Sequence, residues 1–346
     1  VMRVLARGNW MDDSGEVVQA SYPGFLADES DPDEVPSRLD LANWMTSSGN
    51  PLTARTFVNR LWKQLFGSGL VRTLGDFGTQ GSRPSHPALL DWLAADFVEH
   101  GWDIKRLQTM IISSAAYLQS SVNRQRYHEI DPANRFLARA PRFRLSAEEV
   151  RDGALSISGL FNPAIGGPSV YPYQPANYLS SIGKGWKESN DGALYRRGLY
   201  TFWRRTMLYP TFQIFDAPSR EFCSVNRPRT NTPLQALVTL NDPTFVEAAR
   251  VFGQRILSEG GAHDEDRLAF AFTAATSRPP KPAEFAVLRD TLAEQRAEYA
   301  ADRAAAGQLI ENGKAPTPEG IDPAELAAWT ALANILLNLD ETITRE

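Results

Sequence analysis

The chain has 346 residues, of which 42% are hydrophobic and 22% are charged, and its formal net charge is −5 at pH 7. This composition is typical of a globular protein with one or two domains. It excludes an overall electrostatic attraction to nucleic acid or to an anionic membrane. No apolar run approaches the ~20 residues of a membrane-spanning helix. We therefore expect no nucleic-acid partner and no transmembrane segment.

The sequence offers few ligands for a metal or cofactor. Its single cysteine, Cys223, cannot form an intrachain disulfide or a paired-cysteine metal or haem site. The four histidines show none of the HxxH, HExxH or HxH spacings of zinc sites. The acidic stretch 28–34 lacks the glycine-centred pattern of a calcium loop, so we interpret it as solvated, with calcium binding as the alternative. We expect no metal site and no cofactor within this chain.

Residues 1–35 are expected to be extended, with a short strand in the stretch MRVLARG. The opening VMRVLARGNW resembles the interior of a strand, which suggests a domain taken from a longer protein. A helix then begins at Asn50, as its cap, and Pro51, as its first residue. Apolar residues recur at helical spacing along this stretch, and Gly67 stands where a helix-terminating glycine belongs.

Two further helices follow in quick succession. One begins at Pro87 and ends at Gly101, and the next is capped by Asp103. Together with the preceding helix, they predict a compact helical subdomain. Farther along, Ser146 and Glu149 have the spacing of a capping box, which predicts another helix start.

The stretch GDFGTQGSRPSHP, between the first two helices, contains the DFG tripeptide of protein kinases. A kinase also requires a glycine-rich strand loop, a strand lysine and an HRD loop, and the sequence has none of them. We interpret the tripeptide as a turn in which glycine permits unusual backbone angles. His86 precedes Pro87, where it can cap a helix, bond the backbone or act as a base. Because spacing cannot reveal a catalytic partner, catalytic residues stay unknown, with His86 and Asp76 as candidates.

Residues 160–230 are rich in glycine, proline and aromatic residues and show few helical periods. The stretch LYRRGLYTFWRRTMLYPTFQIFD is enriched in aromatic residues, which predicts one or two short strands. An irregular region of this length is unusual in a compact domain and is often functional. Its candidate ligand-binding residues are Arg196, Arg197, Trp203 and Arg204.

Two interpretations of this arginine-rich and aromatic stretch stay open. Guanidinium groups bind carboxylate, sulfate or phosphate through two parallel hydrogen bonds, and aromatic faces stack on flat ligands or sugars. Alternatively, the aromatic rings belong to the core and the arginines pair with acids such as Asp216 and Glu221. Further rings are contributed upstream by Tyr171, Tyr173, Tyr178 and Trp186.

The polar stretch NRPRTNTPLQALVTLND, residues 226–242, leads into another helix. Arg227, Arg229 and Asn231 could bind an anion at the start of that helix, where free N–H groups point outward. They could equally fix the loop by bonding backbone carbonyls. Helical patterns then continue to the end of the chain.

The predicted fold is therefore mainly α: a multi-helix globular domain with a long loop region containing one or two short strands. We expect one domain over 1–346, with an N-terminal helical part (36–160), a loop and short-strand insertion (161–230) and a C-terminal helical part (231–346).

Three stretches together resemble one known family. They are residues 50–121, the stretch RFRLSAEEVRDGALSISGLF with GGPSVYP, and NRPRTNTPLQALVTLNDPTFVEAAR. They resemble the planctomycete domain of unknown function 1553, also called planctomycete-specific domain 1, over nearly the whole chain. The positions here that match residues typical of the family are Asn59, Arg60, Trp62, Asp76, Phe77, Gly78, His86, Pro87, Trp92, Arg151, Asp152, Arg227, Thr232, Pro233, Gln235 and Asn241.

The resemblance implies a periplasmic, extracellular or cell-envelope location and a parent protein with upstream domains, one of which is a c-type cytochrome that would hold haem c. It assigns no reaction and no catalytic residue. Two function classes follow. One is a binding or assembly module for a polysaccharide or an envelope protein. The alternative is an enzyme that acts on polysaccharide or is coupled to electron transfer through the haem, if Asp76, His86, Arg227 and Asn231 converge.

Overall fold

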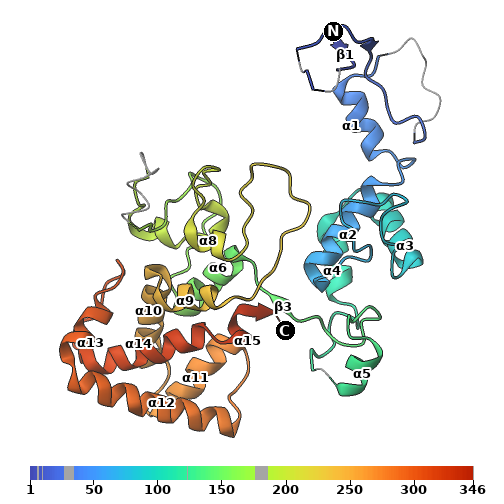
Figure 1. Cartoon of the computed structure of the whole chain (residues 1–346). Coiled ribbons are helices and arrows are strands. Elements are labelled where there is room, and N and C mark those ends of the chain that lie inside the picture. Colours follow the sequence, from blue (N-terminus) through green and yellow to red (C-terminus); the bar gives the residue numbers. More distant parts are fainter. Residues whose placement is uncertain (6–7, 10, 27–34, 123, 176–185, 346) are drawn as a thin grey trace. The chain divides into compact units, whose positions relative to one another are not determined.

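The computed structural model describes residues 1–5, 8–9, 11–26, 35–122, 124–175 and 186–345. The chain forms two compact units, Val1–Pro141 (unit 1) and Arg142–Glu346 (unit 2), and each has its own hydrophobic core. Helices dominate both units, which confirms the mainly α fold class (Figure 1). The expected division at residues 160 and 230 stays a prediction. The acidic stretch 28–34 lies outside the described residues.

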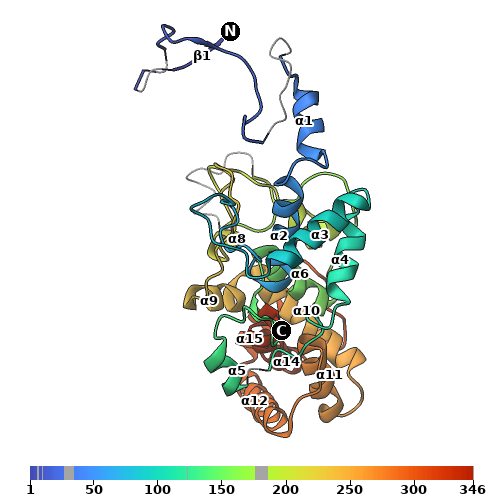
Figure 2. The same ribbon diagram turned by 90° about the vertical axis from the view of Figure 1, so that its right-hand side faces the viewer.

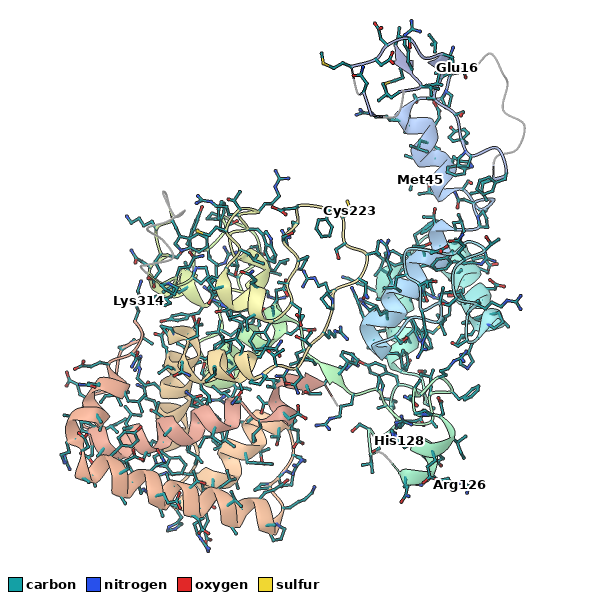
Figure 3. All side chains as sticks on the ribbon, viewed as in Figure 1. Glu16, Met45, Arg126, His128, Cys223 and Lys314 are labelled. Atoms are coloured by element: carbon teal, nitrogen blue, oxygen red, sulfur yellow. The ribbon has the colours of Figure 1, made fainter. Side chains whose placement is uncertain are left out.

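Unit 1 begins with a short antiparallel strand pair and continues as helices. The strand expected in MRVLARG is present, and Met2 pairs with Val18. The elements described in this unit are β1 (Met2–Arg3), β2 (Val17–Val18), α1 (Arg38–Thr46), α2 (Thr53–Phe66), α3 (Pro87–Glu99), α4 (Ile104–Ile112) and α5 (Gln125–Ile130). Figure 3 labels His128 on α5.

The start of α2 shows how a local side chain fixes a helix boundary. The Asn50 side-chain oxygen accepts hydrogen bonds from the backbone N–H groups of Leu52, at 3.0 Å, and Thr53, at 3.2 Å. The cap position is Leu52 and the helix begins at Thr53, so the predicted start at Asn50 and Pro51 is two residues too early, although the Asn50 side chain does bind the first N–H groups. At its other end, α2 stops at Gly67, as expected.

The core of unit 1 lies among α2, α3 and α4. Val58, Phe97 and Leu107 are almost fully buried there. The rings of Phe57 and Phe97 stack with their centroids 5.0 Å apart. No described residue before Asn50 is buried, so this core depends on the segments that follow it.

Asn59 on α2 holds the loop that leads to α3. Its buried amide donates to the carbonyl of Val71 at 2.9 Å and accepts from the Val71 N–H at 2.8 Å. A β-carbon at Gly69 would lie 2.8 Å from the Asn59 side-chain oxygen, so only glycine allows this close approach. The Ser85 N–H donates to the Leu70 carbonyl at 2.8 Å, which closes the loop at its base.

Unit 2 is an assembly of helices whose two ends are joined by a strand pair. Phe143 lies opposite Arg345 in this pair. The predicted capping box is confirmed, because Glu149 accepts from the Ser146 N–H at 2.8 Å and its own N–H donates to the Ser146 hydroxyl. The elements described in this unit are β3 (Phe143–Arg144), α6 (Ala147–Ser158), η1 (Asp191–Tyr195), η2 (Gly198–Tyr200), α8 (Pro210–Ile214), α9 (Pro233–Asn241), α10 (Pro243–Glu259), α11 (Asp264–Thr276), α12 (Pro282–Ala301), α13 (Arg303–Ile310), α14 (Pro323–Leu337), α15 (Asp340–Ile343) and β4 (Thr344–Arg345).

The central contact of unit 2 is between α10 and α14, which lie side by side in both views (Figures 1 and 2). Phe252 and Ile256 of α10 and Trp329 and Leu332 of α14 have no exposed surface. Helices α6, α11 and α12 pack around this pair. Among the described residues, no helix is both long and apolar enough to cross a membrane.

An arginine between α11 and α12 joins three elements of this unit. Arg278 donates to Glu284, at the start of α12, at 2.7 Å and to Glu341 of α15 at 2.6 Å. The hydrogen bonds from Arg278 and from the Lys281 N–H lower the pKa of the Glu284 carboxyl to about 2. The network therefore holds α15, and with it β4, against the helical core.

The described residues of the loop region 161–230 include two short 3₁₀ helices and α8. The strands expected there appear as isolated bridges, and the side chains of Arg151 and Arg196 bind several of the nearby carbonyls. The bridges pair Asn162 with Arg196, Val170 with Thr201 and Arg204 with Met207.

We predict that Asn59→Ala destabilises unit 1 by about 2–4 kcal/mol, because it leaves the buried N–H and carbonyl of Val71 without partners. Urea denaturation followed by circular dichroism measures this. Arg60→Ala is the matched control on the same helix, and its exposed side chain predicts little change. Equal effects of the two substitutions would contradict the anchoring role of Asn59.

We predict that Glu284→Gln lowers the melting temperature of unit 2 at neutral pH, because it removes a carboxylate bound by Arg278. The folded-state pKa of Glu284 lies below its ordinary 4.5, at about 2. Its stabilising contribution is therefore present above about pH 4.5 and is lost as the pH falls through about 2. Calorimetry between these limits should show the wild type and variant converging on acidification. Glu294→Gln, in an exposed part of α12, serves as the control.

Candidate functional site

The DFG stretch in unit 1 is a turn closed by its own aspartate. Asp76 is exposed, and its carboxylate accepts from the Gly78 N–H at 2.8 Å. The Thr73 hydroxyl donates to the Asp76 carbonyl at 2.7 Å. Asp76 and Gly78 therefore have a structural role in the loop between α2 and α3.

His86 occupies the cap position of α3 but makes no capping hydrogen bond. Its Nδ1 lies 3.0 Å from the Ser85 hydroxyl, and its half-buried ring meets Phe136 edge to face. The Asp76 side chain binds Gly78, and His86 contacts Ser85 and Phe136, so these contacts do not join the two side chains. Arg227 and Asn231, the other members of the predicted polar set, belong to unit 2.

In unit 2, Arg151 of α6 binds the backbone of the arginine-rich stretch. Its side chain is 1% exposed and donates to the carbonyls of Leu194 and Arg196. Its neighbour Asp152 accepts from the Gly198 N–H at 2.7 Å. Burial raises the pKa of the Asp152 carboxyl, and the hydrogen bond from Gly198 only partly offsets this. Two consecutive side chains of α6 thus fix the backbone of residues 194–198.

Arg196, a predicted ligand-binding residue, is buried and bonds backbone. It donates to the carbonyls of Pro168, at 2.7 Å, and Gly166, and its guanidinium lies 3.9 Å from the centroid of the Tyr200 ring. The Tyr200 hydroxyl accepts from the Gly166 N–H at 2.6 Å. Gly166 and Gly167 have φ angles of 80° and 86°, which favour glycine. Arg196 therefore holds the GGP turn in place.

A buried carboxylate anchors the same region to α10. Glu247 is 6% exposed and accepts from the Tyr195 hydroxyl at 2.8 Å. It also accepts from the N–H groups of Lys314 and Ala315, at 2.6 and 2.7 Å. Lys314, labelled in Figure 3, extends to Glu188 at 2.8 Å. The arginine-rich stretch is thus joined to α6, to α10 and to the loop between α13 and α14.

We call residues 161–171 and 192–202 the loop platform, since the parallel bridges hold these two segments together. The platform exposes two large aliphatic side chains, Ile165 with 85% and Leu199 with 72% of its surface accessible. Arg197 is also exposed, with its guanidinium 5.7 Å from the centroid of the Phe161 ring. The sequence pattern indicated Arg197 but not the two aliphatic residues, because neither belongs to a periodic apolar pattern.

The aromatic residues of the region contact one another. Tyr171 stacks on Phe202 at 4.7 Å between centroids, and Trp186 meets Tyr171 edge to face at 5.1 Å. Trp203 donates to the Ser219 carbonyl at 3.4 Å and packs against the core of unit 2, with Arg220 over its ring. Tyr178 lies outside the described residues.

The loop between α8 and α9, where Figure 3 labels Cys223, is held by two polar contacts. Arg227 binds the Glu148 carboxylate at 2.9 Å. Asp216 accepts from the Thr230 N–H at 2.7 Å rather than from an arginine of the aromatic stretch. The predicted residue Arg227 thus pairs with an acid that the sequence had not suggested.

Arg229 and Asn231, the last two predicted residues, are exposed. The Arg229 guanidinium lies 4.3 Å from the Phe143 ring centroid, beside β3. Arg204 takes part in a backbone bridge with Met207. Within the described residues, no group of three or more histidine, cysteine or acidic side chains could hold a metal ion.

We predict that Asp152→Asn stabilises unit 2 at neutral pH, because asparagine keeps the acceptor for the Gly198 N–H and removes a half-buried charge whose desolvation outweighs its attraction to Arg151. The folded-state pKa of Asp152 is raised, so protonation stabilises the fold below its ordinary 3.8, and this contribution is lost as the pH rises through the folded-state value. The melting temperatures of variant and wild type should therefore converge in acid and separate near pH 7. Asp290→Asn, at an exposed aspartate, is the control. A less stable Asp152→Asn protein at pH 7 would contradict this account.

Comparisons with known proteins bear on the family alone. Neither the curated proteins nor the solved structures include a match to this chain. The sequence profile of one family, PSD1, described as a protein of unknown function (DUF1553), matches residues 37–292. This match spans well over half of the chain and includes α1 to α11 and the first half of α12. The chain belongs to the PSD1 (DUF1553) family of proteins of unknown function.

Proposed function

We propose that this domain is a non-catalytic binding and assembly module that docks on a protein of the cell envelope through the loop platform. In this proposal it serves a larger cytochrome-c-linked protein outside the cytoplasm, as the family resemblance implies. The observation that carries the proposal is the exposure of Ile165 and Leu199 on a backbone fixed by buried side chains. No cofactor within the chain is required.

The rigidity of the loop platform supports a role in binding. Loops usually lose conformational entropy when a partner orders them, and this lowers the affinity. Here Arg151, Arg196 and Asp152 fix the backbone before any partner binds. A large apolar side chain on a fixed backbone can enter a pocket of a partner at little entropic cost.

The chemistry of the loop platform favours a protein partner over a neutral polysaccharide. Sugar rings bind on exposed flat aromatic faces, whereas Tyr171, Trp186 and Phe202 contact one another. The exposed residues are aliphatic, and Arg197 beside them carries a positive charge. We therefore propose a partner with an apolar hollow rimmed by carboxylates.

The alternative, an enzyme that acts on polysaccharide or is coupled to electron transfer through haem c in an upstream domain, has less support. His86 contacts a hydroxyl and a phenyl ring, and Asp76 closes its own turn. A general base needs a position from which it can reach the proton that it removes. Neither residue's contacts indicate such a position.

We predict that Leu199→Glu weakens binding of the partner at least about tenfold, because it places a negative charge against an apolar, carboxylate-rimmed surface. The partner is first identified by a photo-crosslinking residue at position 199 in the parent protein, in its own cells. The purified partner is then titrated calorimetrically with the wild type and with Leu199→Glu. Leu199 is exposed, so the variant should keep the wild-type melting temperature.

Val287→Glu is the matched control, because Val287 is a similarly exposed aliphatic residue on α12. A crosslinker at position 287 should not capture the same partner. Equal affinities of Leu199→Glu and Val287→Glu would refute docking through the loop platform, as would identical crosslinks from the two positions. Crosslinks to a second copy of the chain, or to the upstream domains of the parent, would contradict a separate envelope protein as the partner of the loop platform.

A further inference from the structure

The polar and apolar faces of α9 in unit 2 are reversed. A helix at the surface of a globular protein normally buries its apolar face and exposes its polar face. The residues that α9 buries are Gln235 and Thr239, each 1% exposed. On the opposite side of the helix, three leucines have between 37% and 56% of their surface accessible: Leu234, Leu237 and Leu240. We call these three residues the leucine stripe.

Hydrogen bonds on the buried face hold α9 in this orientation. The Gln235 side-chain amide donates to the Ile214 carbonyl at 3.0 Å. The Thr239 hydroxyl donates to the side-chain oxygen of Asn338, the residue that follows α14. A rotation of the helix that buried the leucine stripe would break both bonds and leave the Ile214 carbonyl without this partner. The leucines are therefore exposed on a fixed helix, and an apolar surface of this kind marks an interaction site.

The leucine stripe is self-complementary. Its three members are evenly spaced along the helix, so a second copy turned by 180° about an axis at Leu237 presents the same pattern. In that arrangement Leu237 meets its own counterpart, and Leu234 of each copy meets Leu240 of the other. Two-fold dimers are the commonest oligomers, and both copies use the same surface in them. A second copy of this chain therefore fits the stripe.

The charges at the two ends of α9 favour the same antiparallel arrangement. No residue between Arg229 and Asp242 is charged, so the stripe itself brings no like charges together. Arg229 is exposed before the N-terminus of α9, and the half-buried Asp242 follows its C-terminus. Antiparallel pairing places the Arg229 end of one copy beside the Asp242 end of the other, and it opposes the two helix dipoles. A parallel pair would instead place like charges side by side.

We infer that the leucine stripe is a self-association surface, through which two copies of the chain pair with their α9 helices antiparallel and Leu237 on the two-fold axis. Leucine side chains at this spacing interdigitate between two packed helices. Pairing removes their exposed apolar surface from water, which drives association. The stripe shares no residue with the loop platform, so the inference does not rest on the proposed function.

The first test measures self-association of the full chain by sedimentation velocity over a range of concentrations. The wild type should dimerise, and Leu237→Glu should weaken the dimer at least about 100-fold, because it places two carboxylates against each other on the axis. Leu237→Met, which keeps an apolar side chain, should retain the dimer. Because Leu237 is exposed, both variants should keep the wild-type melting temperature.

Two controls separate this surface from the rest of the molecule. Val287→Glu changes an exposed aliphatic residue of α12 in the same way and should dimerise like the wild type. Leu199→Glu, in the loop platform, should also dimerise like the wild type, so a failure of the proposed function would leave the dimer unchanged.

A second test uses disulfide formation to locate the axis, after the single, exposed Cys223 has been replaced by serine. Leu237→Cys should form an intermolecular disulfide under mild oxidation, because a residue on the axis lies opposite its own counterpart. Leu234→Cys should not, because its counterpart lies about 9 Å farther along the helix at a rise of about 1.5 Å per residue, beyond the ~7 Å that a disulfide spans between Cα atoms. Leu234→Cys combined with Leu240→Cys should form the disulfide again.

Three results would overturn the inference. The first is a wild type that stays monomeric at about 0.1 mM. The second is equal dimerisation of Leu237→Glu and the wild type. The third is an equal disulfide yield from Leu237→Cys and Leu234→Cys, which would indicate a parallel or random contact. Binding of a different protein or of a lipid surface to the stripe of a monomeric chain would likewise contradict a second copy as the occupant.

Discussion

Backbone hydrogen bonding in the irregular region is the constraint on which unit 2 depends. A buried peptide group without a partner is costly, and the carbonyls of Gly166, Pro168, Leu194 and Arg196 bind side chains rather than a helix or sheet. Arg151 and Arg196 supply them instead, each with several donors from one planar group. Removal of either guanidinium would leave several carbonyls buried without partners. The shape of the surface above them therefore depends on two buried side chains.

The helices could be predicted because their signals are local. Ser146 and Glu149 lie three residues apart, and Asp103 binds the N–H three residues later, so each pattern is visible in a short stretch of sequence. The irregular region could not be predicted in the same way. Arg151 binds carbonyls more than 40 residues away. The aromatic residues predicted strands, but they could not show that side chains would bind carbonyls that a neighbouring strand would otherwise bind.

The candidate sites show the same limit. Arg229 was recognised as a possible anion ligand because it precedes a helix start. The approach of Arg229 and Arg345 to the Phe143 ring could not be predicted, since the pairing of β3 with β4 joins residues some 200 positions apart. Conversely, Arg196 has a guanidinium group that could bind an anionic ligand, but its side chain is buried. Residue type indicates what a side chain can bind, whereas the fold decides whether it binds a ligand or its own backbone.

The pairing of β3 with β4 has a mechanical consequence. The first and last elements of unit 2 are neighbours, so a force applied at its two ends would act directly across a ladder of two residue pairs. Such a ladder separates in sequence, one pair at a time, and offers little resistance compared with the packed helices α10 and α14. The hydrogen bonds of Arg278 to Glu284 and Glu341 would then resist the force. Tension on the protein would therefore pull Arg345 away from Phe143 before it disturbed the hydrophobic core.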